Sequence, residues 1–554
     1  MKRKKLIFAI LIIFLFSLGL FIQGQDYDVE IQKTWGSSGN EFAYSLAVTS
    51  NNLLLAGNTT SFSGLNVGAF LAKFTLSPFD VVWSKGIQIP RSAFYDVAID
   101  SANVSAVGYA RVGTSDRPVI IKLDQANGNL KWARYLRHLS GPRTSESGKA
   151  FSIITFGSYF CLSGFLQGIQ TIPFPEPDII IWYGGIFACF DANGNLNTAY
   201  SKFFSTDFQV TFFPYGIASY SSNLFLAGTT DSFRTGFIAK YDGSSLSMIS
   251  TSNSNLQNIT SIATDNTGNL YITGRYGGNI LLAKFNSNLG LIYSKVIQVS
   301  GGGIGYSIAL DSLNNIYIGG RKASLPDEAL LVKLDNNGNL IWCKSWGGGG
   351  TENIYKIRVD SNNVVHAAGS SQSINNNLNN ISCPVSNVSI SFFTDTTSID
   401  NISSISFNPS ITTISGILDT PVNNEALYLK ISPAVTTTVT TTTTTTTTVT
   451  TTPTTTTRTT TLTTTSTATA TATSTTTTTN TLTSTTTTTI PGATTTVTAC
   501  SPILLRVNEI EKINNVLSLN QILYFSLFTS ISLTFLFSYI IISNRRKIKW
   551  KKQR

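Results

Sequence analysis

The chain of 554 residues contains very little histidine and little cysteine. Its two histidines, His138 and His366, are too few for a histidine-based metal centre or for a serine-histidine-aspartate triad built in the usual way. His366 lies in a predicted strand, where we expect a structural role. The five cysteines do not define a dense disulfide scaffold. These scarcities favour a binding or structural protein over a metal-dependent or histidine-dependent enzyme.

The chain also lacks a broad basic surface, although its formal net charge is +10. The excess Lys and Arg residues are concentrated in residues 2–5 and 545–554, whereas acidic and basic side chains nearly balance within residues 25–432. A protein that binds a polyphosphate backbone needs an extended basic field. Nucleic acid is therefore not an expected partner.

Each end of the chain carries an apolar segment beside its basic cluster. "LIFAILIIFLFSLGLFI", residues 6–22, follows a basic start and predicts a secretory signal peptide over residues 1–24, with its cleavage left open. "ILYFSLFTSISLTFLFSYIII", residues 522–542, carries no charge and is long enough to cross a membrane as one helix. The basic tail 543–554 marks the cytoplasmic side. We expect a single-pass protein of the cell membrane whose intervening residues are extracellular.

A threonine-rich segment precedes the predicted transmembrane helix. Residues 433–499 consist mostly of threonine with scattered Pro, Ala and Val, a composition that cannot build a hydrophobic core. In an exported protein it predicts a disordered, O-glycosylated stalk. Residues 500–521 form a short juxtamembrane segment between this stalk and the membrane.

A block of four short strands recurs through residues 25–432. Runs rich in Val, Ile, Leu and aromatic residues alternate with Gly, Asn, Asp and Ser, which is typical of strands joined by hairpins. The seventh block lacks a fourth strand, and "VEIQKTWG" at residues 29–36 matches the fourth strand "LIWCKSWG" at residues 340–347. The first strands read "AYSLAVTS" (43–50), "FYDVAIDS" (94–101), "KAFSIITF" (149–156), "PYGIASYS" (214–221), "NITSIATD" (258–265), "GYSIALDS" (305–312) and "IYKIRVDS" (354–361).

This repetition predicts an all-β fold. Four-stranded units that recur about every 45 residues, the last one completed by the N-terminal strand, indicate a seven-bladed β-propeller over residues 25–432. The disordered stalk and one transmembrane α-helix follow it. The repeats resemble the seven-bladed β-propeller repeat family of bacterial and archaeal surface proteins, in which "YSIAxDxxGNxYxxG" precedes "LxKLDxxGNLxW". The resemblance implies the fold and a surface protein of a prokaryote, for which we expect an archaeal source. It implies little about activity.

The loop "DNNGNL" at residues 335–340 has the acidic and amide residues of a calcium loop. Leu340, Ile341 and Trp342, however, stand where further ligands would be needed. Asn337-Gly338 instead predicts a type I′ hairpin turn, in which both central residues have positive φ. The same device recurs at Asn193-Gly194 and Asn127-Gly128, so we predict turns and no metal.

The tryptophans after these turns have a structural interpretation. Trp83, Trp132 and Trp342 are expected to cover the seams between blades. "LDxxxGNLxW" also resembles the repeat of pyrroloquinoline-quinone dehydrogenases, but the adjacent cysteine pair and the Glu, Asn and Asp calcium cluster of such enzymes are missing. We therefore expect no cofactor.

Candidate ligand contacts lie in the two longest insertions, at residues 165–184 and roughly 370–424. Both follow the second strand of their block, and such loops emerge on one face of a propeller, which predicts a recognition surface there. Aromatic side chains in the first insertion suit a sugar ring or a protein partner, or else pack on the base of their own loop. These residues are Phe165, Phe174, Trp182 and Tyr183.

The same regions contain candidate modification sites. Glycans on the second insertion would argue against its being the contact surface. Cys161 with Cys189, and Cys343 with Cys383, are possible disulfides or buried free thiols. The N-glycosylation sequons stand at Asn58, Asn103, Asn258, Asn380, Asn387 and Asn401.

Three functions fit these observations. The first is an anchored, adhesin-like or receptor-like surface propeller that binds an extracellular protein or a glycan. The second is an anchored polysaccharide hydrolase or lyase with a carboxylate site on the same face. The third is a structural component of the cell envelope. Whether the chain is an enzyme stays open, with binding favoured, and turnover of a polysaccharide would separate the first two.

Overall fold

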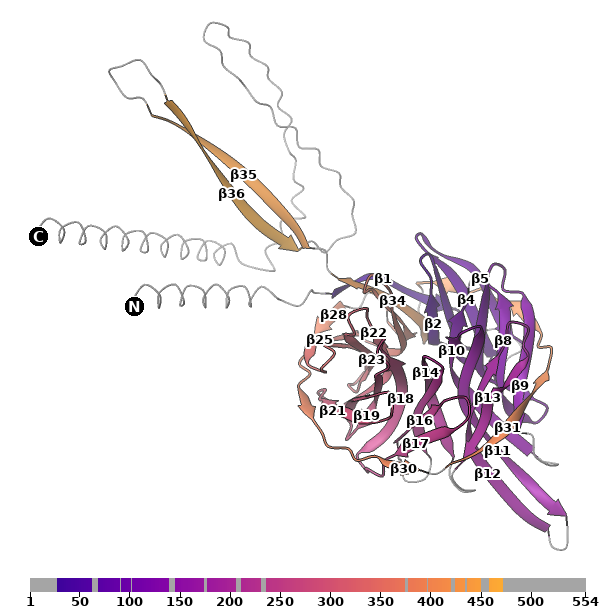
Figure 1. The fold of residues 1–554 in the computed structure, drawn as a ribbon. Coiled ribbons are helices and arrows are strands. Elements are labelled where there is room, and N and C mark those ends of the chain that lie inside the picture. Colours follow the sequence, from indigo (N-terminus) through magenta and orange to yellow (C-terminus); the bar gives the residue numbers. More distant parts are fainter. Residues whose placement is uncertain are drawn as a thin grey trace, which may run out of the picture. The chain divides into compact units, whose positions relative to one another are not determined.

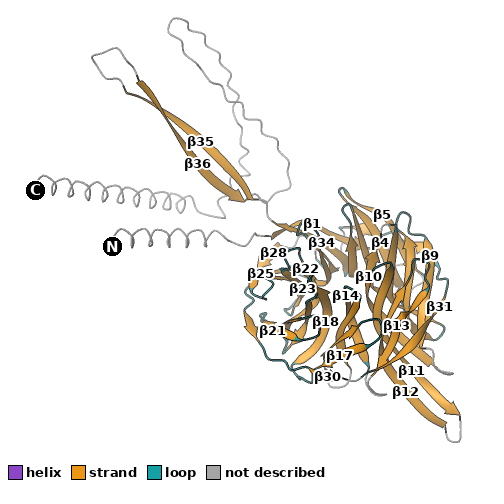
Figure 2. Cartoon of the chain, viewed as in Figure 1, coloured by secondary structure: helices purple, strands orange, loops and turns teal. Residues whose placement is uncertain are grey.

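A computed structural model of the chain describes residues 27–61, 68–89, 91–100, 102–138, 145–173, 177–205, 211–230, 236–373, 377–395, 397–419, 424–433, 436–449 and 458–471. All regular structure in this part of the chain is β-strand (Figure 2). No helix among the described residues is long and apolar enough to cross a membrane. The predicted signal peptide, juxtamembrane segment, transmembrane helix and cytoplasmic tail lie outside the described residues.

The strands form antiparallel four-stranded units in which consecutive strands are hydrogen-bonded neighbours. From the N-terminus these units are β2 (Glu41–Val48), β3 (Asn52–Thr59), β4 (Gly68–Leu76) and β5 (Phe79–Ile87); β6 (Ala93–Ile99), β7 (Asn103–Val112), β8 (Ser115–Asp124) and β9 (Leu130–His138); β10 (Ser145–Phe156), β11 (Tyr159–Pro173), β12 (Pro177–Phe190) and β13 (Leu196–Ser205); β14 (Phe212–Tyr220), β15 (Asn223–Thr230), β16 (Gly236–Tyr241) and β17 (Leu246–Ser250); β18 (Leu256–Thr264), β19 (Leu270–Tyr276), β20 (Asn279–Phe285) and β21 (Leu291–Ile297); and β22 (Gly303–Leu310), β23 (Ile316–Lys322), β24 (Glu328–Leu334) and β25 (Leu340–Gly347).

The last unit combines the two ends of the repeat region. It consists of β26 (Asn353–Val359), β27 (Val365–Ser371), β34 (Glu425–Pro433) and the N-terminal strand β1 (Tyr27–Gly36). As its match to residues 340–347 predicted, β1 pairs antiparallel with β34, with Lys33 opposite Tyr428. This pairing fixes the N-terminal strand in the sheet and covers an edge that would otherwise be open.

The units follow one another around a common centre (Figure 1). The first strand of each unit contacts the first strand of the next, and β26 contacts β2. The hydrophobic core lies between adjacent units: Ala56 and Leu71 of one unit, for example, join Val97 and Val104 of the next in one buried cluster. Burying a side chain of this kind contributes about 1.5–3 kcal/mol relative to exposure. This all-β arrangement of many antiparallel sheets fits a β-propeller.

A further segment runs along the outer strands of these units. We call residues 377–395 and 397–419 the belt. Its strands are β28 (Asn377–Asn380), β29 (Val385–Asn387), β30 (Phe393–Asp395), β31 (Ser398–Ser406), β32 (Ile411–Thr413) and β33 (Ile417–Leu418). They pair in order with β25, β21, β17, β13 together with β9, β5 and β1. The belt therefore passes every unit in turn (Figure 1), and in the sequence it lies between β27 and β34 of the last unit.

The belt corrects the prediction that residues 370–424 emerge as a loop on one face. The outermost strand of each unit has backbone N–H and C=O groups that its own unit leaves unpaired, and the belt strands pair with this edge. Apolar belt side chains also enter or pack against the core clusters. These residues include Leu378, Cys383, Ile390, Ile399, Ile402, Phe407 and Ile414.

The threonine-rich segment also contains strands. β35 (Thr436–Val449) and β36 (Arg458–Thr471) pair antiparallel, with Thr436 opposite Thr471. Disorder was predicted for this segment from its lack of core-forming residues. The structure differs because threonine is β-branched, which favours extended backbone and hydrogen-bonded pairing even without a core.

Candidate functional site

The first strands of all units line a central cavity of about 910 Å³. Each first strand places one ring or hydroxyl at an equivalent position near its start, two residues before a buried Leu, Val or Ile. Six of these positions hold aromatic residues, which we call the aromatic collar: Tyr44, Tyr95, Phe151, Tyr215, Tyr306 and Tyr355. In β18 the equivalent residue is Thr260, which leaves a gap between Tyr215 and Tyr306.

The collar residues contact one another from unit to unit. Ring centroids lie 4.7 Å apart for Phe151 and Tyr215, 5.4 Å for Tyr44 and Tyr95, and 5.6 Å for Tyr306 and Tyr355. The planes are tilted, so neighbouring rings meet at an angle and each stays half-buried at the cavity. Aromatic surface of this kind can stack against an apolar ligand face.

Three collar hydroxyls are available to a ligand. Those of Tyr44, Tyr215 and Tyr306 have no hydrogen-bond partner among the described residues, although all three line the cavity. Burial raises the pKa of all three tyrosines. Their hydroxyls are therefore protonated at neutral pH and can both donate and accept hydrogen bonds.

One residue further along the first strands, charged groups replace small ones. The equivalent positions hold Ser or Gly in most units, but Asp96 in β6 and Lys356 in β26. The buried Asp96 carboxylate accepts hydrogen bonds from Ser45 Oγ at 2.6 Å, Ser152 Oγ at 2.8 Å and Lys356 Nζ at 3.0 Å. The Arg358 guanidinium lies 3.7 Å away from the same carboxylate.

The surroundings of Asp96 and Lys356 shift the pKa values of both side chains. Burial by itself would raise the pKa of Asp96, but the positive charges of Lys356 and Arg358 and the hydrogen bonds to the carboxylate lower this pKa to about 2. Burial lowers the pKa of Lys356 to about 8, although Asp96 acts in the opposite direction. At neutral pH both groups are mainly charged and hold β2, β6, β10 and β26 together.

The predicted ligand contacts adjoin the collar only in part. Phe165 lies 5.7 Å from Phe151 and 4.9 Å from Phe213, between ring centroids, so it extends the aromatic surface outward. Tyr183 is half-buried, and the backbone of Trp182 pairs with Gly168 in the β11–β12 hairpin. This hairpin projects beyond the neighbouring strands (Figure 1). Phe174 lies outside the described residues, and a ligand role for these four residues stays a prediction.

The "DNNGNL" loop is a turn, although its type differs from the prediction. Asp335 Oδ1 accepts hydrogen bonds from the N–H groups of Asn337 at 2.9 Å and Asn339 at 2.8 Å. Gly338 has a φ of 72°, but Asn337 does not have a positive φ, so the turn is not type I′. The loop between β24 and β25, residues 335–339, is longer than the two-residue loop of a type I′ hairpin, and its left-handed residue is the glycine. No group of His, Cys, Asp and Glu in the described residues is arranged to hold a metal ion.

The outer tryptophans lie at seams between units, as predicted. Trp83 Nε1 donates to Gln125 O at 3.1 Å, and Trp132 Nε1 donates to Ala192 O at 3.0 Å. Both acceptors belong to the equivalent turn of the next unit. Trp342 packs on Tyr27 of β1 with 5.2 Å between ring centroids. Each seam thus joins an aromatic ring to a neighbouring turn or strand.

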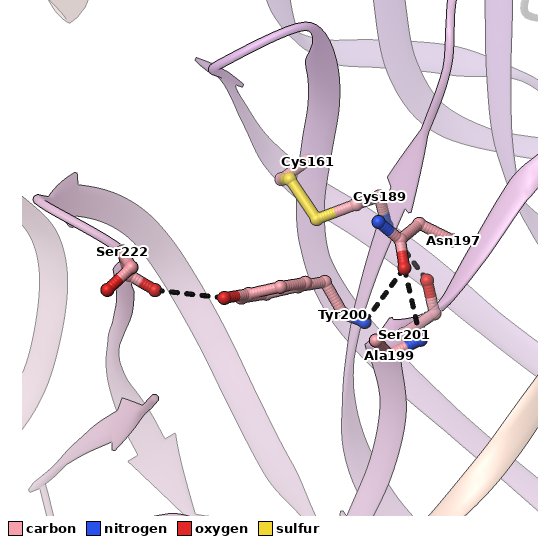
Figure 3. The surroundings of a disulfide bond; sticks show 7 residues. All are labelled: Cys161, Cys189, Asn197, Ala199, Tyr200, Ser201 and Ser222. Carbon is pink, nitrogen blue, oxygen red and sulfur yellow. Dashed lines mark hydrogen bonds between the residues drawn. A yellow bond between two sulfur atoms is a disulfide. The ribbon is translucent and has the colours of Figure 1, made fainter. Parts of the chain in front are cut away.

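Two disulfides join cysteines of the described residues. Cys161 and Cys189 are register partners in β11 and β12, and Ser201 Oγ accepts a hydrogen bond from the Cys189 N–H at 3.0 Å (Figure 3). The Cys343–Cys383 bond ties β25 to the belt. His366 is structural, with Nδ1 2.8 Å from the Tyr428 hydroxyl.

The sequons fall into two groups. Asn380, Asn387 and Asn401 are exposed on the belt. Asn58, Asn103 and Asn258 lie in β3, β7 and β18, where they are only partly exposed and each has a buried Oδ1 atom. The belt sequons are therefore better placed to carry a glycan.

No family model matches the chain, and the search of curated proteins gives no match. Among solved structures, Sqt1 from Chaetomium thermophilum is similar at 10% identity and a TM-score of 0.30, over 62% of this chain and 82% of that one. The hemagglutinin-neuraminidase of parainfluenza virus 5 (SV5), determined with the ligand DANA, is similar at 7% identity and a TM-score of 0.31, over 67% and 96%. At these scores neither likeness supports an argument about function, and the fold rests on the strand topology.

Proposed function

We propose that the chain is a membrane-anchored, seven-bladed β-propeller of the cell surface that binds a carbohydrate in its central cavity. The seven four-stranded units, joined in a ring by contacts between their first strands, support the blade count. The apolar segments at residues 6–22 and 522–542 and the threonine-rich stalk support export and anchoring.

The aromatic collar carries the proposal. Sugar rings have apolar C–H faces and many hydroxyl groups, so a site for them needs flat aromatic surface next to free hydrogen-bonding groups. The collar supplies both, because its rings are half-buried and the hydroxyls of Tyr44, Tyr215 and Tyr306 have no partner among the described residues. Phe165 extends this surface toward the β11–β12 hairpin.

A hydrolase or lyase at this site is the less favoured function. The buried carboxylate of Asp96, in the cluster next to the cavity lining, is held by two serines, a lysine and an arginine, and its pKa of about 2 is unsuited to proton transfer near neutral pH.

The test uses the full-length chain in detergent on a glycan array, followed by titration of each bound glycan. We expect Tyr306→Phe, which removes one free collar hydroxyl, to weaken binding about 3- to 10-fold, in line with the loss of one hydrogen bond. The matched control is Tyr159→Phe, because Tyr159 does not line the cavity. Binding of no glycan, or equal losses in both variants, would reject the proposal, and release of reducing ends would favour the hydrolase.

A further inference from the structure

Two cations lie together at the side of the cavity formed by β26. Lys356 Nζ lies 3.0 Å and the Arg358 guanidinium 3.7 Å from the one Asp96 carboxylate. This carboxylate also accepts hydrogen bonds from Ser45 Oγ and Ser152 Oγ. Two cations therefore share one carboxylate that is already engaged by hydroxyl groups.

Arg358 has unused hydrogen-bonding capacity. Its side chain is 37% exposed, whereas that of Asp96 is 1% exposed. Besides its contact with Asp96, the guanidinium donates a long hydrogen bond of 3.4 Å from Nη1 to Ile357 O. A guanidinium has five N–H donors in a planar fork that fits a carboxylate with two hydrogen bonds. Arg358 also lines the cavity, so these donors can reach a ligand there.

A further cation lies beside the collar. Lys149 Nζ is 4.5 Å from the ring centroid of Tyr109 and 3.5 Å from the Tyr95 hydroxyl, to which it donates. The Asp116 carboxylate acts on Lys149 electrostatically and is itself paired with Arg91 at 3.4 Å. The acid that does line the cavity, Asp360, accepts hydrogen bonds from the N–H groups of its own turn and lies 3.3 Å from His366 Nε2. Its ion-pair partner is thus His366, and Arg358 is paired with Asp96 instead.

We propose that the cavity selects acidic saccharides, with the ligand carboxylate on Arg358 and the sugar ring on the aromatic collar. This inference rests on the proposed carbohydrate site and names its ligand class. An anion gains from cations that are partly removed from water, because electrostatic attraction is stronger there than in bulk solvent. A neutral sugar can use the collar but gains no charge interaction with Arg358. Sulfated saccharides share the same chemistry and form a separate arm of the test.

The test measures binding of matched pairs of glycans to the full-length chain. Each pair has the same sugar sequence: galacturonate oligomers with their methyl esters, and sulfated oligosaccharides with their desulfated forms. We expect the acids to bind at least tenfold more tightly than the esters, with a preference that shrinks at high salt. In Arg358→Gln this preference should fall to twofold or less, while binding of the ester is unchanged. Arg358→Lys should keep part of the preference. This result would show that the loss in Arg358→Gln comes from the missing charge and not from misfolding.

The control is Lys131→Gln, which removes a 41% exposed lysine from β9, away from the cavity lining. It should leave the preference intact. Equal binding of acid and ester by the wild-type chain would overturn this inference and leave the carbohydrate proposal standing. A preference that survives in Arg358→Gln would also overturn it, and so would preference for sulfate alone. Binding of no member of any pair would overturn both proposals.

Discussion

Lys356 of β26 donates a hydrogen bond of 3.0 Å to Asp96 of β6, although β2 lies between these two strands in the ring. The Asp96 carboxylate also accepts from Ser45 of β2 and Ser152 of β10. One buried carboxylate thus joins the first strands of four consecutive units. The contact fixes their relative positions at the base of the candidate ligand site.

Replacing this carboxylate should destabilise the fold strongly. Asp96→Asn leaves the Lys356 ammonium buried without a counter-charge, and we expect a loss of about 3–5 kcal/mol in the free energy of unfolding. Urea unfolding of the full chain, followed by tryptophan fluorescence, measures it. The control is Asp116→Asn, which removes a partly exposed pair with Arg91 and should cost less than about 1 kcal/mol. Equal losses would show that Asp96 is not a special contact.

The same carboxylate predicts an acid-sensitive step. Its pKa is lowered to about 2, below the value of ~3.9 in an unfolded chain. A depressed pKa means that ionised Asp96 stabilises the fold above about pH 4, and that this stabilisation is lost as the pH falls toward 2. Thermal unfolding across this range should show a loss of about 2–3 kcal/mol that is missing in Asp96→Asn. Parallel pH profiles for the two chains would contradict the assignment.

The belt should depend on its disulfide. The Cys343–Cys383 bond closes a separation of 40 residues, which corresponds to about 4 kcal/mol in the chain-entropy account. In the double variant Cys343→Ser and Cys383→Ser, we expect limited proteolysis to cut the belt near residues 385–395 first, as shown by mass spectrometry. The matching variant Cys161→Ser with Cys189→Ser should leave the belt protected, because that bond lies within the β11–β12 pairing. Unchanged cleavage kinetics in the first variant would mean that pairing alone retains the belt.

The tightness of packing at the seams between units can be tested by replacing glycine residues. Gly194 has a φ of 81°, and a Cβ atom there would lie 2.7 Å from Trp132 Cδ2. Gly113 has a φ of 65° with open space around it. We expect Gly113→Ala to cost about 1–2 kcal/mol for the left-handed conformation alone. Gly194→Ala should cost about 1–3 kcal/mol more, because the ring must move. Equal melting temperatures for the two variants would show that the seam tolerates the methyl group.

Local patterns in the sequence were sufficient for the strands and for ring closure. Alternating apolar residues and Asn, Asp and Gly at turns act over a few positions, so they remain readable without the fold. The turn at Gly338 was located correctly, but its type was not, because the dipeptide Asn-Gly does not determine how many residues the loop contains. The collar and Asp96 stand at aligned positions of the first strands, where Asp96 and Lys356 replace small residues. This alignment does not by itself reveal that the side chains meet at one centre.

The sequence by itself determined the four-stranded repeat and the N-terminal strand that completes the last unit. Only the tertiary structure decided the path of the belt and the central cluster. The belt strands pair through backbone groups with outer strands that range along the chain from β25 back to β1, and backbone pairing leaves little trace in side-chain type. Asp96 and Lys356 are 260 positions apart, and their contact exists because the closed ring brings β6 and β26 to the same centre.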